Sequence, residues 1–126
     1  MWNETKEIVY IVDDDPSVRK ALEVLLYSAG IEAQSFASAR EFLNSGFREQ
    51  NACLIVDVKM RGLGGLELHQ ELIARGGSLP VIFLTAFDSE EIREQAKAQG
   101  GLGYFRKPVD DQAMLDSIQW ALSKNP

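Results

Sequence analysis

Short apolar runs alternate with amphipathic stretches along the whole chain. Apolar and β-branched residues gather over residues 8–12, 52–57, 81–84 and 102–105. Such runs are too short for free-standing helices and are typical of strands buried on both faces of a parallel sheet. A fifth segment, 32–36, alternates polar and apolar residues, and this pattern favours an edge strand. The sequence therefore predicts five strands.

A helical pattern follows each strand. The first helix begins at Pro16 and ends before Gly30, because proline fits the first turn of a helix and glycine favours its end. Ser38 and Glu41 have the spacing of a capping box, which predicts a short second helix. Asp88 is expected to cap the fourth helix, whose apolar stripe is thin. The last three helices are expected over 66–74, over 90–99 and from about 110 to 122.

Strict alternation of strand and helix predicts one α/β domain. The expected fold is a doubly wound (βα)5 sandwich of the flavodoxin-like type, with a parallel sheet in the order 2-1-3-4-5. The whole chain, 1–126, is predicted to be a single domain with a core at about 8–122, and 123–126 is predicted to start a linker. In such a sheet, ligands bind beyond the carboxyl ends of the strands, where the strand order reverses.

Composition narrows the function classes. The chain has 126 residues and a net charge of −6, which argues against direct binding of nucleic acid by this domain. No apolar run is long enough to span a membrane, and the first residues lack a basic-then-apolar signal pattern. The single cysteine, Cys53, excludes an internal disulfide and is expected to pack as a small hydrophobe. We therefore predict a cytoplasmic protein without a membrane partner.

Polar side chains end four of the five predicted strands. Asp13 and Asp14 follow the first strand, Asp57 ends the third, Thr85 ends the fourth and Lys107 follows the fifth. Each residue alone is ordinary, as a helix cap, a strand-end hydroxyl or a solvated charge; their joint occurrence is not. Three neighbouring carboxylates repel one another, so some must protonate unless a cation binds among them, and oxygen ligands of this kind suit Mg²⁺. A carboxylate beside Mg²⁺ can attack phosphorus, while an ammonium and a hydroxyl stabilise the transferring oxygens.

In this arrangement the chain resembles a response-regulator receiver domain. The resemblance covers about residues 8–122 and rests on four motifs in the right order at the right strand ends. The motifs are Asp13-Asp14, Asp57-Val58-Lys59-Met60 followed by Gly65, Thr85-Ala86, and Gly103-Tyr104 just before Lys107-Pro108. We also expect the Lys107–Pro108 peptide bond to be cis.

The resemblance implies a role for each of these residues. It implies Asp57 as the phosphoacceptor assisted by Thr85 and Lys107, with Thr85 and Tyr104 as the switch pair. The implied ligands of Mg²⁺ or Mn²⁺ are Asp13, Asp14, Asp57 and the backbone carbonyl of Lys59. The implied phosphoryl donor is a sensor histidine kinase.

The resemblance further implies a switch domain rather than an enzyme with a separate substrate. Such a domain catalyses only its own phosphoryl transfer and dephosphorylation. Phosphorylation would change a protein-interaction surface, with a candidate homodimer face formed by the fourth helix, fifth strand and fifth helix. The expected outcome is regulation of transcription through an output domain, of helix-turn-helix type, that lies outside this chain.

Two positions depart from the family pattern. Arg61 stands where proline is usual, so the loop after Asp57 is expected to be more mobile. Gly101 stands where alanine is usual, which is expected to loosen the start of the last strand. His69, the only histidine, is expected on the surface of the third helix, away from the strand ends. A phosphohistidine donor must therefore come from a partner protein.

Two alternatives remain open at this point. One is a haloacid-dehalogenase-like phosphatase, because residues 12–17 partly mimic its D-x-D motif with Asp13 as nucleophile. That interpretation leaves Asp57 without a role, and the chain is short for the family. The other is a receiver-like module that binds a partner without being phosphorylated. Phosphorylation of Asp57 and Asp13 variants separates all three hypotheses.

Overall fold

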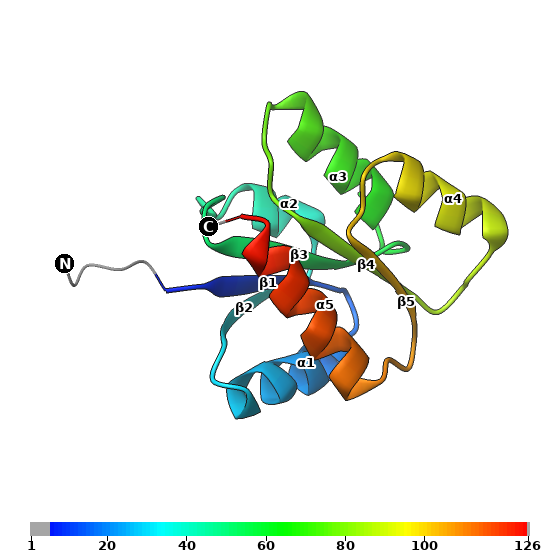
Figure 1. Ribbon diagram of the computed structural model, residues 1–126. Coiled ribbons are helices and arrows are strands. Elements are labelled where there is room, and N and C mark those ends of the chain that lie inside the picture. The colour runs from blue at the N-terminus through cyan, green and yellow to red at the C-terminus, as the bar shows by residue number, and fades with distance from the viewer. Residues whose placement is uncertain (1–5, 126) are drawn as a thin grey trace.

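The computed structural model describes residues 6–125, which form a three-layer α/β sandwich (Figure 1). Strands and helices alternate along the chain, as predicted. None of the helices within these residues is long and apolar enough to cross a membrane. The elements are β1 (Ile8–Val12), α1 (Pro16–Ser28), β2 (Glu32–Phe36), α2 (Ala39–Leu43), β3 (Ala52–Asp57), α3 (Gly65–Ala74), β4 (Val81–Thr85), α4 (Glu90–Ala98), β5 (Gly103–Arg106) and α5 (Asp111–Ser123).

All five strands are parallel and lie in the order β2-β1-β3-β4-β5. This confirms the predicted doubly wound, flavodoxin-like sheet. In register, Val12 lies beside Val56, and Asp57 lies beside Leu84. The carboxyl ends of β1, β3 and β4 therefore meet at one edge of the sheet, where strand order reverses between β1 and β3.

The central strands are buried on both faces, which explains their continuous apolar runs. Alternate residues of each strand point to opposite sides of the sheet and join two separate hydrophobic clusters. Helices α1 and α5 cover one cluster, and α2, α3 and α4 cover the other (Figure 1). Cys53 of β3 lies in the first of these layers, and burial raises the pKa of its thiol to about 12. It packs as a small hydrophobe, as predicted.

Helix caps agree with the sequence at α2 but not at α4. The Ser38 hydroxyl accepts a hydrogen bond from the Glu41 amide at 3.1 Å, as the capping box predicts. At α4 the N-cap is Ser89, which accepts from the Ile92 amide at 3.1 Å. The prediction that Asp88 caps this helix is wrong. Asp and Ser are equally good N-cap residues, so the sequence alone does not distinguish Asp88 from Ser89. Because Ser89 is the N-cap, the Asp88 carboxylate is available for other contacts.

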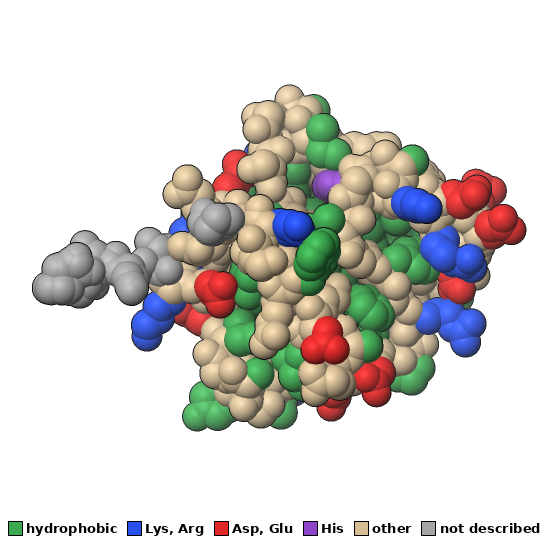
Figure 2. Space-filling model, in the orientation of Figure 1, with side chains coloured by type: hydrophobic (Ala, Val, Ile, Leu, Met, Phe, Trp, Pro, Cys, Tyr) green, Lys and Arg blue, Asp and Glu red, His purple; other side chains and the backbone are tan. Residues whose placement is uncertain are grey.

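His69 is buried, in contrast to the predicted surface position. It is only 6% exposed, and in Figure 2 it appears as a small purple area between α3 and α4. Its Nδ1 lies 3.2 Å from Nε2 of Gln99, and its ring packs edge-on against Phe83 at 5.5 Å between centroids. The helical period explains this burial, because His69 is three residues from both Leu66 and Leu72 on the buried face of α3.

At Gly101, just before β5, the ring of Phe83 fills the space that a side chain would need. A Cβ atom at this position would lie 2.7 Å and 2.9 Å from two ring carbons of Phe83, and 3.1 Å from the Ala96 carbonyl oxygen. Phe83 is completely buried and is packed against His69. The absence of a side chain at Gly101 therefore makes room for the large aromatic ring of Phe83 on the neighbouring strand β4.

We predict that Gly101→Ala destabilises this domain. The added methyl group overpacks a rigid core site, and the expected loss is about 1–3 kcal/mol of unfolding free energy. Urea denaturation of the variant and the parent measures it. In a Phe83→Leu background the same substitution should cost less. Equal stability of parent and Gly101→Ala would show that Phe83 can move aside.

The C-terminal residues dock against the start of β3. The side-chain amide of Asn125 donates to the backbone carbonyl oxygens of Glu49 and Ala52, the latter at 3.0 Å. The backbone carbonyl of Asn125 accepts a hydrogen bond from the Asn51 backbone amide at 2.9 Å. Pro126 lies outside the described residues. The predicted division between core and linker stays a prediction.

Candidate functional site

The strand-end residues predicted from sequence meet in space. Lys107 Nζ lies 2.8 Å from Asp13 Oδ2 and 3.1 Å from Asp57 Oδ2, so one ammonium bridges the ends of β1 and β3. The Lys107 amide donates to the Thr85 carbonyl at 2.8 Å, which ties the segment after β5 to the end of β4. The Lys107–Pro108 peptide bond is cis, as predicted.

Asp13 is fully buried and held on several sides. Its Oδ1 accepts from the Asp15 amide at 2.9 Å, its amide donates to the Phe36 carbonyl at 3.2 Å, and its carbonyl accepts from Arg19 Nη1 at 2.6 Å. Its Oδ2 is close to the Lys107 ammonium, yet among the described residues it has no hydrogen bond of good geometry. A buried carboxylate oxygen without a well-formed hydrogen bond is well suited to bind a cation.

Asp57 is nearly buried at the end of β3, with 9% of its side chain exposed. Its Oδ1 accepts from the Lys59 amide at 3.2 Å. Burial and then the charge of Asp13 raise the pKa of Asp57, and the opposing effect of Lys107 is smaller. For Lys107, burial favours a lower pKa, but its contacts with both carboxylates raise the pKa overall. One ammonium is shared between two carboxylates, so negative charge remains in excess.

The acidic cluster could hold a metal ion. Asp13, Asp14 and Asp57 each offer a carboxylate oxygen, and these atoms lie within 4.8 Å of one another. Asp14 is exposed, whereas the other two are buried, so the site opens to solvent on the Asp14 side. Hard oxygen donors, excess negative charge and the poorly satisfied Asp13 oxygen fit a divalent cation such as Mg²⁺. The Lys59 carbonyl stays a predicted ligand.

Glycine is required directly behind the cluster. A Cβ atom on Gly65 would lie 2.5 Å from the Asp57 carbonyl oxygen and 3.2 Å from a methyl carbon of Val56. The start of α3 therefore packs against the backbone at the end of β3. This contact explains why the motif Asp57 to Met60 is completed by Gly65.

Thr85 and Tyr104 both contact the loop between β4 and α4, but through different residues. The buried Thr85 hydroxyl oxygen accepts from the Phe87 amide at 2.9 Å. The half-buried Tyr104 hydroxyl donates to Asp88 Oδ1 at 2.9 Å. Burial and this hydrogen bond raise the pKa of Tyr104. The contact between Asp88 and Tyr104 of β5 was not predicted from the sequence, because the residues around Asp88 suggest only a helix cap.

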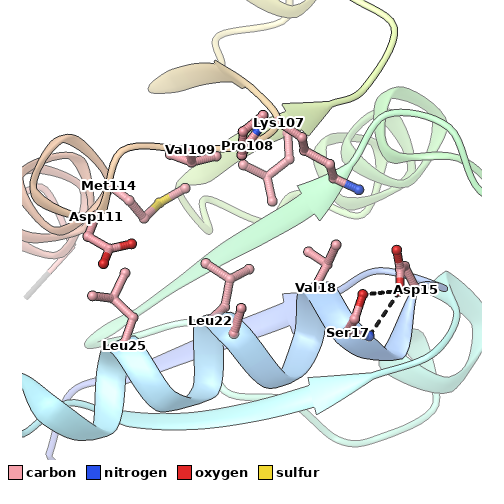
Figure 3. Close-up of a pocket in the computed structure, with 12 residues that line it drawn as sticks. Asp15, Ser17, Val18, Leu22, Leu25, Lys107, Pro108, Val109, Asp111 and Met114 are labelled. Carbon is pink, nitrogen blue, oxygen red and sulfur yellow. Dashed lines mark hydrogen bonds between the residues drawn. The ribbon is translucent and has the colours of Figure 1, made fainter.

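A groove of about 500 Å³ runs beside the site between α1 and the segment that follows β5 (Figure 3). Lys107 and Asp15 lie at one end of it. Val18 and Leu25 of α1 line this groove and are half-buried, packed at the margin of the core. Apolar residues from both sides line the groove, among them Val18, Leu22, Leu25, Pro108, Val109 and Met114.

Comparison with known proteins identifies this arrangement. A model of the response regulator receiver domain matches residues 9–119, a range that contains every strand-end residue described above. The chain belongs to this family. It is thus a receiver domain, a signalling switch of two-component systems.

Individual relatives agree with this assignment. The receiver domain is 38% identical over 117 residues to the transcriptional regulatory protein TdiR of Thauera aromatica, covering 93% of this chain and 52% of TdiR. The structure of the response regulator StyR superposes with a TM-score of 0.88 at 39% identity, over 96% of this chain and 61% of StyR. FixJ-N superposes with a TM-score of 0.85 at 28% identity, over 95% of this chain and 96% of FixJ-N.

The receiver domain spans about half the length of the curated relatives it matches. The matched share is 52% of TdiR and 56% of the transcriptional regulatory protein FixJ of Azorhizobium caulinodans. The remaining part of those relatives has no counterpart in the residues compared.

Proposed function

We propose that this receiver domain takes a phosphoryl group onto Asp57 from a sensor histidine kinase, in a Mg²⁺-dependent reaction. The observation that supports Asp57 over Asp13 is the difference in access. The Asp57 side chain is 9% exposed, whereas that of Asp13 is 0% exposed and bonded on both its side chain and its backbone. A nucleophile must reach phosphorus, and of these two carboxylates it is Asp57 that keeps a path to solvent.

Each residue of the site has a role in this proposal. Asp13, Asp14 and Asp57, with the Lys59 carbonyl, would hold Mg²⁺ or Mn²⁺, which neutralises charge and polarises phosphoryl oxygens when bound. An Asp57 oxygen forms the new bond to phosphorus as the bond to the donor nitrogen breaks. The Lys107 ammonium and the Thr85 hydroxyl stabilise negative charge on the transferring group. The domain also hydrolyses its own acyl phosphate, which returns the switch to the resting state.

The donor is a separate protein in this proposal. His69 is the only histidine, and it is buried between α3 and α4 with its Nδ1 bonded to Gln99. In this proposal the phosphohistidine is supplied by the kinase. The domain works in the cytoplasm and binds neither membrane nor nucleic acid itself. Its phosphorylation controls transcription through an output domain, as the names of TdiR and FixJ suggest for those relatives.

Labelling with acetyl phosphate tests the proposal without knowledge of the kinase. The intact mass of the protein should increase by one phosphoryl group when Mg²⁺ is present and stay unchanged in EDTA, because the anionic donor is repelled by uncompensated carboxylates. The label should be labile to hydroxylamine, as an acyl phosphate is. A chain that is never labelled under any of these conditions would favour the module that binds without phosphorylation.

The same proposal includes a switch through Thr85 and Tyr104. A phosphoryl group on Asp57 offers new acceptor oxygens to the Thr85 hydroxyl, in competition with its contact to the Phe87 amide. Movement of that loop would carry Asp88 and release Tyr104 from its hydrogen bond. Helix α4 has one buried residue, Ala96, and is the helix least anchored to the core. The face formed by α4, β5 and α5 changes as a result and supports homodimerisation.

We predict that Thr85→Ala uncouples phosphorylation from this switch. The variant should still carry phosphate on Asp57 but lose most of the increase in self-association, equivalent to a coupling of about 1–3 kcal/mol. Analytical ultracentrifugation of phosphorylated parent and variant measures the difference. Thr85→Ser keeps the hydroxyl and serves as the matched control. A full response in Thr85→Ala would place the coupling elsewhere, for example through α1.

A further inference from the structure

The loop between β3 and α3 is joined to the turn after β1 by a hydrogen bond from the Arg61 backbone. The Arg61 amide donates to Asp14 Oδ2 at 3.1 Å. A proline at this position could not make this contact, because proline has no backbone N–H. The contact with Asp14 therefore requires a residue other than proline at position 61.

We propose that Arg61 is a positioning residue for the metal site, and that it acts on Asp14 through its backbone amide rather than its guanidinium. The inference rests on the proposed Mg²⁺-dependent function. It goes beyond that function because it assigns a role to a residue outside the predicted ligand set.

Asp14 is the carboxylate of the cluster that most needs such support. Asp13 is buried, and its side chain accepts a hydrogen bond from the Asp15 amide. The Asp57 side chain accepts hydrogen bonds from the Lys59 amide and from the Lys107 ammonium. Asp14 is exposed, and within residues 6–125 the Arg61 amide is the hydrogen-bond donor to its side chain. An exposed carboxylate without this donor would rotate freely and lose conformational freedom on binding a cation.

The loop that carries Arg61 is itself held in place. The Gly65 amide donates to the Val58 carbonyl at 3.1 Å and closes the loop at its base. At Gly64 a Cβ atom would lie 2.6 Å from the same carbonyl oxygen, so the chain passes too close for any side chain. Lys59 and Arg61 stand two residues apart on this closed loop, and their amides serve Asp57 and Asp14 respectively.

The hydrogen bond leaves Asp14 able to bind a metal ion. A carboxylate has two oxygens, and the amide engages Oδ2. Ligand carboxylates in metal sites are commonly oriented by such outer hydrogen bonds, whose removal weakens metal binding. The Arg61 guanidinium is exposed and is not needed for this role.

Substitutions at position 61 separate the amide from the side chain. Arg61→Ala keeps the N–H and should bind Mg²⁺ as the parent does. Arg61→Pro removes the N–H and should bind Mg²⁺ about fivefold more weakly, less than the roughly 10- to 100-fold loss seen at buried outer-shell contacts, because this bond is exposed. Isothermal titration with MgCl₂ measures both constants. In an Asp14→Ala background, the difference between alanine and proline at position 61 should disappear.

Two contrary outcomes have different meanings. If Arg61→Pro binds Mg²⁺ as tightly as Arg61→Ala, the amide has no positioning role and the inference is overturned, while the proposed function stands. If the parent itself does not bind Mg²⁺, the proposed function and this inference fall together.

Amide hydrogen exchange tests the hydrogen bond directly and keeps the loop sequence unchanged. In metal-free protein, Asp14→Ala should speed exchange of the Arg61 amide several-fold. The Lys59 amide, which donates to Asp57 instead, should be unaffected and is the matched control. Unchanged exchange at Arg61 would show that the contact with Asp14 does not persist in solution, and would overturn the inference independently of any proline variant.

Discussion

Asp57→Asn should abolish labelling by acetyl phosphate, whereas Asp13→Asn should leave a slower, still Mg²⁺-dependent reaction. The amide of asparagine cannot act as the nucleophile, so loss of Asp57 removes the acceptor itself. Loss of the Asp13 charge weakens the cation site and its contact with Lys107 but keeps the acceptor. Intact-mass spectrometry over a time course distinguishes the two variants. Labelling of Asp57→Asn together with none in Asp13→Asn would instead support the phosphatase-like interpretation.

Thermal unfolding shows whether lost labelling is merely lost structure. The folded state raises the pKa of Asp57 above its ordinary value of 3.8, so at neutral pH the ionised carboxylate destabilises the fold. Stability from this group is greatest below the ordinary pKa and falls as pH rises through the raised pKa. Asp57→Asn removes the charge, and in EDTA at pH 7 it should unfold at a higher temperature than the parent. Below the ordinary pKa this advantage should vanish.

The strands and their functional ends could be predicted from sequence for a simple physical reason. A parallel strand buried on both faces needs a continuous apolar run, so the polar residue that ends each run is conspicuous. Asp57 is the last of the six buried residues of β3, and Thr85 is the last of the five buried residues of β4. Alternation of strands and helices then determines the sheet order well enough to bring Asp13 and Lys107 to the same edge.

The contacts that sequence reasoning missed all join distant segments. His69 lies on the buried face of α3, but the local pattern of that helix does not reveal that Phe83 and Gln99 are its partners. The residues around Gly101 do not reveal that the ring of Phe83 fills the space beside it. The contacts of Asp88 and Arg61 likewise involve residues elsewhere in the chain. The residues next to them in the sequence suggest only a helix cap and a mobile loop. Periodicity predicts which face of an element is buried, but not which side chain it meets.

Lys107→Ala should have opposite effects on metal binding and on phosphorylation. The ammonium lies 2.8 Å from Asp13 and 3.1 Å from Asp57 and competes electrostatically with any cation in the cluster. Its removal should tighten Mg²⁺ binding by about tenfold, because more negative charge is left uncompensated. The same removal deletes a donor to the transferring phosphoryl group and should slow labelling by acetyl phosphate by about 100- to 1,000-fold.

These opposite signs distinguish a catalytic lysine from a structural one. A lysine that only held β5 against the site would, when lost, loosen the cluster and weaken Mg²⁺ binding and labelling together. Isothermal titration with MgCl₂ and the labelling rate at saturating Mg²⁺ separate the two cases. Lys59→Ala is the control, because this exposed lysine lies next to the site and the substitution keeps the backbone amide that donates to Asp57. It should change the labelling rate far less than Lys107→Ala, since its side-chain ammonium lies over the Phe87 ring rather than between the carboxylates.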